Sequence, residues 1–166
     1  MAFRELVQTL ESMQHMYETL HQLAEKKKVH IMKNEVSELT ACLSQESKLL
    51  KSLTEHEAAV RSAATRLQRD MGLRPKLKIT ISEIVKLIFN PNDKQELMKL
   101  QADIATTTDK LRRANELNQQ LIQQSLEFVG FSLDVIYGEP EEEVVYKKPT
   151  TAPGGVKRTG QFDTRA

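Results

Sequence analysis

The chain has 166 residues, 28% of them charged, with a formal net charge of +1 and no tryptophan. This length fits one domain, and the balanced charge excludes a global field that would attract nucleic acid or an acidic membrane. Cys42 is the single cysteine, which excludes an intramolecular disulfide, and no apolar run reaches the length of a signal peptide or membrane span. We therefore expect a soluble, cytoplasmic protein with a mostly aliphatic core.

The first 71 residues contain neither glycine nor proline, and their apolar residues recur at helical steps of three and four. The phase of this series breaks near residues 32–35, which predicts a helical hairpin with Asn34 as the N-cap of the second helix. Cys42 is expected to be a small buried residue beside the second series. The first series is Phe3, Leu6, Leu10, Met13, Tyr17, Leu20, Ala24 and Ile31. The second is Val36, Leu39, Leu43, Leu50, Leu53, Val60, Ala64, Leu67 and Met71.

A connector and a short helix follow the hairpin. Gly72 and Pro75 are typical of a helix end, because glycine suits the C-cap and proline blocks continuation. Thr80 followed by Glu83 forms a capping box, which predicts a short helix over residues 81–89.

The last predicted helix begins at Asn92 or Asp93 and ends at Tyr137, before Gly138 and Pro140. Its apolar series keeps one face as far as residue 125, and beyond that point apolar residues occupy nearly every face. The series is Leu97, Leu100, Ile104, Leu111, Ala114, Leu121, Phe128 and Val135. The residues that spread over the other faces are Leu126, Val129, Phe131, Leu133 and Ile136.

Residues 138–166 hold four of the six glycines, three of the five prolines and the acidic run "EPEEE". This composition predicts a flexible, disordered polar tail after a helical domain that spans residues 1–137. The expected fold is all-α: an antiparallel helical hairpin, a short linking helix and one long C-terminal helix, together an elongated three-helix bundle.

The sequence offers little catalytic chemistry. Glu18 and His21, with Glu25 on the same face, match one half of a helical di-iron motif, but the second half is absent and a solvated face is favoured. We predict no catalytic residue, no metal, no cofactor and no enzyme activity.

Two basic clusters also stand out. The triplet Lys26–Lys28 near the end of the first helix is interpreted as a solvated face that complements the helix dipole. Arg74, Lys76 and Lys78 in the connector could contact nucleic acid, but the chain lacks aromatic platforms and strong net charge.

The apolar end of the last helix allows three interpretations. It could be buried within its own domain, it could form a homodimer interface, or it could receive an amphipathic helix from another protein. In the third case each large apolar side chain that becomes buried contributes about 1.5–3 kcal/mol. Four or five such residues would offset much of an association cost of about 4–15 kcal/mol.

The segment "NELNQQLIQQSLEFV" at residues 115–129 resembles the flagellar export chaperones of the FlgN family, Gram-positive type, and "FDTRA" at residues 162–166 resembles the end of their tail. The resemblance implies a cytoplasmic type III export chaperone for hook–filament junction proteins, which are also called hook-associated proteins. It would bind the amphipathic helices at the C-terminal ends of these proteins, prevent their premature assembly and deliver the proteins to the export gate.

The resemblance also implies particular contact residues. Seven positions match the family motif and two extend the same surface, and together they are the predicted cargo-binding residues: Leu117, Leu121, Ile122, Ser125, Leu126, Phe128, Val129, Phe131 and Leu133. Asn115 and Asn118 are expected to set helix pairing. Tyr146 and Phe162 are candidates for contact with an export gate component.

Partners other than these proteins are not expected: no nucleic acid, no direct membrane insertion, and a monomer or weak dimer as the resting state. Two alternatives remain. One is a structural coiled-coil protein that homo-oligomerises through its C-terminal helix, and the other is a helical nucleic-acid adaptor, for which the near-neutral charge predicts no salt-dependent binding.

Overall fold

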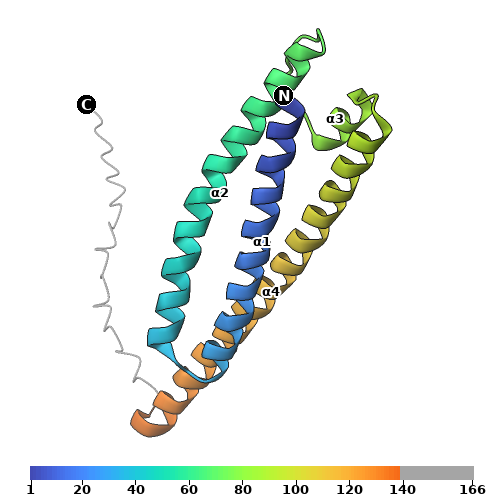
Figure 1. Ribbon diagram of the computed structural model, residues 1–166. Helices are drawn as coiled ribbons and strands as arrows, with labels where there is room; N and C mark the ends of the chain where they lie inside the picture. The colour runs from blue at the N-terminus through green and yellow to red at the C-terminus, as the bar shows by residue number, and fades with distance from the viewer. Residues whose placement is uncertain (139–166) are drawn as a thin grey trace, which may run out of the picture. The chain divides into compact units, whose positions relative to one another are not determined.

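A computed structural model of the protein describes residues 1–138, and the secondary structure within them is entirely helical (Figure 1). This confirms the predicted all-α fold with a hairpin, a short linking helix and a long last helix. The four helices are α1 Ala2–Met32, α2 Val36–Asp70, α3 Ile81–Leu87 and α4 Pro91–Tyr137.

The chain divides into two compact units, Met1–Glu127 and Phe128–Ala166, and their boundary falls within α4. The first unit contains α1, α2, α3 and most of α4, while the described part of the second is the end of α4 and Gly138. The predicted division into a helical domain 1–137 and a polar tail 138–166 stays a prediction, since nearly all of that tail lies outside the described residues.

Within the first unit, α1 and α2 form an antiparallel pair, with α1 between α2 and α4 in Figure 1. Two ion pairs near opposite ends of the pair fix this direction, Glu5 with Arg66 at 2.8 Å and Lys27 with Glu46 at 2.8 Å. The α4 helix runs parallel to α1, because its contacts advance along both helices together. These contacts are Arg4 Nη1 to Glu96 Oε2 (3.0 Å), Gln14 Nε2 to Thr107 Oγ1 (2.8 Å) and Asn118 Nδ2 to the Ala24 carbonyl (2.8 Å).

The first predicted apolar series is buried or partly buried along α1, which confirms it. The core that it forms draws on all four helices, and α3 contributes to it near the C-terminal end of α2. Burial of each large apolar side chain stabilises the bundle by about 1.5–3 kcal/mol. Its fully buried large side chains are Leu6, Leu10, Leu20, Ile84 and Leu97.

The second predicted series is wrong in the N-terminal half of α2. Leu43 and Leu50 are exposed, whereas their neighbours Cys42 and Leu49 are buried and partly buried. The inward row contains a charged residue, Glu46, which pairs with Lys27. A search for apolar residues alone therefore does not identify this row. Burial of Cys42 itself was predicted and is confirmed.

Lys27 also corrects the interpretation of the Lys26–Lys28 triplet as a solvated face. Its side chain is only 10% exposed, and its ammonium group lies 2.8 and 2.9 Å from the two carboxylate oxygens of Glu46. A buried charge needs such a partner, because removing it from water is costly.

Two predicted helix caps need small corrections. Asn34 is not the N-cap of α2: it adopts a left-handed conformation, with φ of 58°, and Glu35 takes the cap position. Asparagine tolerates this conformation better than most residues, which suits the reversal between the helices. Likewise α4 begins at Pro91, and Asn90 Oδ1 accepts a hydrogen bond from the Asn92 backbone at 3.0 Å.

The predicted end of α2, start of α3 and end of α4 are confirmed. Gly72 follows the end of α2 with φ of +73°, the left-handed conformation that glycine supplies at a helix C-terminus. The capping box at the start of α3 is present, since the Thr80 side chain accepts from the Glu83 backbone and the Glu83 side chain accepts from the Thr80 backbone. The α3 helix ends at Leu87 and not at the predicted residue 89, because the backbone turns extended at Ile88.

Candidate functional site

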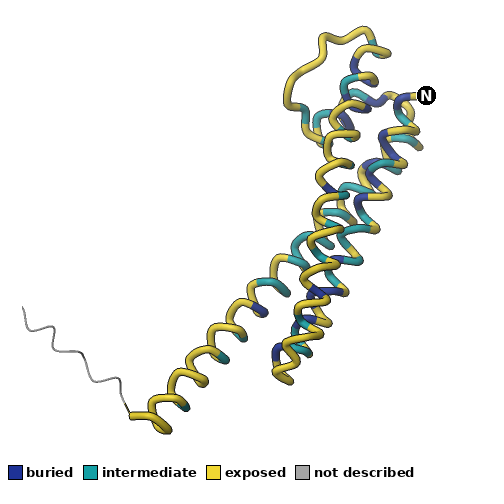
Figure 2. The backbone as a smooth tube through the Cα atoms, turned by 90° about the vertical axis from the view of Figure 1, so that its left-hand side faces the viewer, coloured by how far each residue is buried: buried dark blue, intermediate teal, exposed yellow. Residues whose placement is uncertain are grey.

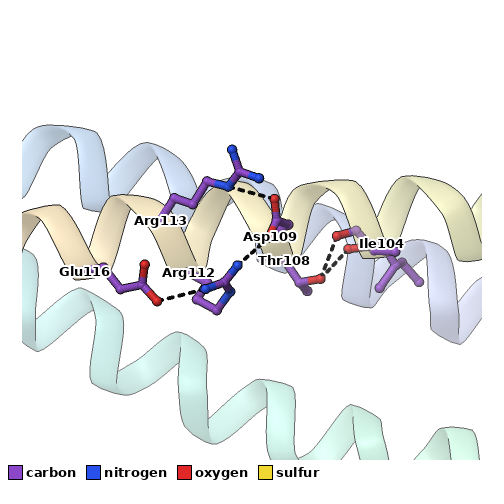
Figure 3. Close-up of polar contacts among 7 residues, drawn as sticks. Ile104, Thr108, Asp109, Arg112, Arg113 and Glu116 are labelled. Atoms are coloured by element: carbon purple, nitrogen blue, oxygen red, sulfur yellow. Dashed lines mark hydrogen bonds and ion pairs between the residues drawn. The ribbon is translucent and has the colours of Figure 1, made fainter.

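In the middle of α4, exposed charged side chains form short-range polar contacts with one another (Figure 3). Asp109 accepts from Arg112 at 2.8 Å and pairs with Arg113 at 2.9 Å, while Arg112 also donates to Glu116 at 2.9 Å. The hydrogen bond from Arg112, followed by the charge of Arg113, lowers the pKa of the Asp109 carboxyl. This part of the helix therefore presents paired charges to solvent, while Ile104 and Leu111 are partly buried against the core.

Asn118 marks the change along α4. Only two residues of the helix are buried, Leu97 and Asn118. The Asn118 amide nitrogen donates to the Ala24 carbonyl of α1 at 2.8 Å, which confirms its predicted role in helix pairing. The side-chain oxygens of Asn115 and Asn118 are buried and have no hydrogen-bond partner within the described part of the chain.

Residues 117–136 of α4, here called the apolar segment, contain every predicted cargo residue. In the first unit, Leu117, Ile122 and Leu126 are exposed, while Leu121 and Ser125 are partly buried. The Ser125 hydroxyl donates to the Leu121 carbonyl at 2.9 Å, so its polar group is satisfied by its own helix.

In the second unit, the described residues continue the apolar segment as helix. Ser132 donates to the Phe128 carbonyl at 2.8 Å and is satisfied in the same way. Gly130 has no atom of the described residues within 4 Å of the place where a Cβ would lie, so packing there does not require glycine. The exposed large residues of this part are Phe128, Val129, Phe131, Leu133, Val135, Ile136 and Tyr137.

These residues form rows seven positions apart, and exposed residues predominate along the tube of this segment (Figure 2). Residues seven apart lie nearly above one another on a helix, so the members of each row that belong to the same unit share a face, here called a stripe. The three stripes are Leu121, Phe128 and Val135; Ile122, Val129 and Ile136; and Leu126 and Leu133.

The exposed side chains of this segment suit association through apolar surface. Within residues 1–138, no group of three or more His, Cys, Asp or Glu side chains is placed to hold a metal ion. None of the helices in this part is both long enough and apolar enough to cross a membrane. Tyr146 and Phe162, the candidates for contact with the export gate, lie outside the described residues.

Sequence reasoning missed one exposed feature on α2. Val36, Leu43 and Leu50 form an exposed row at seven-residue spacing. The spacing was visible in the sequence, but it was interpreted as the buried face. No local signal separates the two rows, because the inward row includes the charged residue Glu46, which is held there by Lys27 of α1.

Comparisons with known proteins point to one family. The family model described as "FlgN protein" matches residues 1–154. A curated relative, "Uncharacterized protein YvyG" of Bacillus subtilis (strain 168), is 23% identical over 137 residues, which cover 82% of this chain and 81% of that protein. No solved structure matches the chain. The family match includes the whole apolar segment.

Proposed function

The chain belongs to the FlgN family of flagellar export chaperones, and we propose that it serves the hook–filament junction proteins. Chaperones of this family bind flagellar hook-associated proteins. In our proposal the apolar segment binds the terminal amphipathic helices of these proteins in the cytoplasm, prevents their premature assembly and keeps them ready for delivery to the export gate. Binding and release alone accomplish this, without ATP hydrolysis.

The observation that carries the proposal is the exposure of large apolar side chains on successive turns of one helix. Phe128 is 70% exposed, Phe131 66% and Ile136 70%. Scattered exposed apolar residues are common on proteins, but a contiguous patch marks an interaction surface. Burial of four or five such residues, at about 1.5–3 kcal/mol each, is comparable with an association cost of about 4–15 kcal/mol. Reversible binding follows from that balance.

The polar groups within the segment favour the same function. Ser125 and Ser132 already donate to the carbonyls one turn back, so an incoming apolar helix leaves neither hydroxyl unpaired. Gln123 donates to Glu127 at 2.9 Å and provides a polar margin beside the stripes. Such a margin around an apolar centre is typical of protein interfaces.

The length of the segment suits a helical ligand. Twenty residues of α-helix span about 30 Å at 1.5 Å per residue. A cargo helix packed at the common crossing angle of about 20° keeps contact over several turns. Two of the stripes would then meet the apolar face of the cargo helix in the manner of a coiled coil, while the remaining stripe covers its edge.

A pull-down with matched variants tests the proposal. Wild-type chain, a Leu126→Asp/Leu133→Asp variant and a Leu43→Asp/Leu50→Asp variant are incubated with a lysate of flagellated cells, and bound proteins are identified by mass spectrometry. All four residues are exposed, so both double variants are expected to fold. We expect the wild type and the α2 variant to retain hook-associated proteins and the α4 variant to lose them. Retention by all three would contradict the proposed surface.

Contact with the export gate is a separate part of the proposal and rests on the family resemblance of the tail. Tyr146→Ala and Phe162→Ala variants should bind cargo normally but support less secretion of junction proteins in cells. Normal secretion by both variants would remove these two residues from the proposal.

A second candidate function is structural. The same stripes could pair two copies of α4 in a coiled coil, because self-association buries equivalent surface. Sedimentation of the chain without cargo separates the two functions. A stable dimer that is indifferent to cargo would favour the structural role, whereas a monomer or weak dimer that dissociates on cargo binding favours the chaperone.

A further inference from the structure

An open cleft of about 410 Å³ lies between the end of α2, the connector after it and α3. It belongs wholly to the first unit and shares no residue with the apolar segment. Clefts of this size are within the range that holds small ligands or a few peptide side chains. The side chains that face a ligand there are Leu73, Arg74, Lys76, Ile79, Lys86 and Leu87.

The walls of the cleft are held in place by hydrogen bonds. Gln68, buried to 3% exposure at the end of α2, donates to the Ala64 carbonyl at 3.2 Å and accepts from the Lys76 backbone at 2.9 Å. This amide therefore fastens the connector to the helix. On the opposite wall, the capping box of Thr80 and Glu83 fixes the first turn of α3. A ligand meets a largely preformed site, which lowers the entropy lost on binding.

The charge in the cleft is unbalanced. Three cationic side chains line it against one carboxylate, Glu83, and that carboxylate already accepts from Thr80 and lies 3.5 Å from Lys76. Within residues 1–138, Arg74 and Lys86 form no ion pair. Two cations therefore point into a cleft whose single acid is already engaged.

Apolar side chains stand between these cations. Leu73 is 42% exposed, Ile79 is partly buried against the core, and Leu87 closes the α3 side. A simple anion would use the cations but not these walls. The complementary ligand carries carboxylates on either side of an apolar side chain.

We propose that this cleft binds a short acidic peptide segment of a partner protein. Its carboxylates pair with Arg74 and Lys86, and an apolar side chain between them inserts against Leu73, Ile79 and Leu87. Arginine offers a carboxylate two parallel N–H donors, which gives the contact direction as well as strength. A nucleic acid fits the cleft less well, because no aromatic side chain lines it for base stacking and the chain carries a net charge of only +1.

The inference goes beyond the cargo function and does not depend on it. The two surfaces involve different elements, so a chain that has lost one can be assayed for the other. A chaperone with a second, charge-dependent site could hold cargo and an acidic partner at the same time.

Fluorescence anisotropy with the full chain tests the cleft. The probe is a short fluorescein-labelled peptide of alternating glutamate and leucine, compared with one of alternating glutamate and serine and with oligothymidylate. We expect the glutamate–leucine peptide to bind most tightly, and its affinity to fall as salt is raised. An Arg74→Glu/Lys86→Glu variant should weaken binding by about tenfold or more, because both contacts become repulsive.

Two further variants serve as comparisons. Leu73→Ser keeps every charge and should weaken the affinity for the glutamate–leucine peptide by at least about threefold. A purely electrostatic attraction would not produce this loss. Lys48→Glu/Lys51→Glu, on an exposed face of α2, makes the same change in net charge and should leave the affinity unchanged. Circular dichroism checks the fold of each variant, and all three should bind cargo helix as the wild type does.

Three results would overturn the proposal. The first is equal peptide binding by wild type and the Arg74→Glu/Lys86→Glu variant. The second is tighter binding of oligothymidylate than of the glutamate–leucine peptide, which would assign the cleft to nucleic acid. The third is concentration-dependent self-association that Arg74→Glu/Lys86→Glu abolishes, which would assign the cleft to a second copy of the chain.

Discussion

Before Asn118, α4 packs one apolar row into the core and carries ion pairs on exposed residues, whereas from Ile122 onward its large apolar side chains are exposed. Both parts are regular helix with apolar residues at similar spacing. The difference lies in what surrounds them, since upstream the row is completed by α1 and α3 of the same chain. Periodicity therefore identifies a surface that needs a partner, but it does not say whether that partner belongs to the same molecule.

The largest effect is expected where a substitution leaves a cavity in the part of α4 upstream of Asn118. Leu97 is fully buried in the core that α4 shares with the other helices. Leu97→Ala should lower the free energy of unfolding by about 2–5 kcal/mol, through lost burial and the cavity left behind. Urea denaturation followed by circular dichroism measures it. A loss below about 1 kcal/mol would show that the upstream row is not a true core.

The buried ion pair of the hairpin should give the next largest effect. Glu46→Ala leaves the Lys27 ammonium without its carboxylate, and we expect a loss of about 1–3 kcal/mol in unfolding free energy. The double variant Lys27→Met/Glu46→Leu removes both charges and should recover most of that loss. If the double variant is no more stable than Glu46→Ala, the pair does not act as a desolvated unit.

The boundary between the two parts can be sharpened at Asn118. Asn118→Ala removes the hydrogen bond to the Ala24 carbonyl and should lower the unfolding free energy by about 1–2 kcal/mol. Cargo binding should change little, because Asn118 faces α1 rather than solvent. Thermal unfolding and calorimetric titration with a cargo helix provide the two measurements. A large loss of affinity for the cargo helix with unchanged stability would show that the cargo-binding surface begins upstream of Asn118.

The smallest expected effect concerns pH at the start of α3. Hydrogen bonds from the Thr80 backbone and side chain lower the pKa of the Glu83 carboxyl below its usual value. Its contribution to stability is therefore complete above that usual value and is lost as the pH falls through the lowered one. Glu83→Gln retains a capping partner without the charge. The stability difference between wild type and this variant should shrink as the pH falls below about 4, and a difference independent of pH would contradict the assignment.

Much of this fold could be predicted from the sequence, because α1 is amphipathic in a simple way and the helix ends carry strong local signals. Gly72 and the Thr80–Glu83 capping box act through neighbouring backbone groups, so their effect is visible without tertiary structure. The inward row of α2 was harder, since it includes Glu46. Only the position of Lys27 across the hairpin makes a buried carboxylate stable there.

The sequence indicated part of the candidate site, because the pattern of apolar residues along one helix is visible without tertiary structure. The all-round apolar pattern after residue 125 indicated a surface in need of cover, and its residues are exposed as that hypothesis requires. Asn118 was expected to set helix pairing, and its amide donates to the Ala24 carbonyl of α1. The acidic-peptide cleft could not be found in this way. Arg74 and Lys86 come together only because Gln68 fastens the connector to α2 and the capping box directs α3.

The central claim is that cargo is bound by the exposed apolar side chains at the end of α4. Phe128 and Val36 are both 70% exposed, so Phe128→Asp and Val36→Asp make the same kind of change at equally accessible positions on different helices. Each should alter the unfolding free energy by less than about 1 kcal/mol. Calorimetric titration with the C-terminal helix of a hook-associated protein should show affinity weakened about tenfold or more by Phe128→Asp and unchanged by Val36→Asp. Equal affinity of Phe128→Asp and wild type would contradict the account.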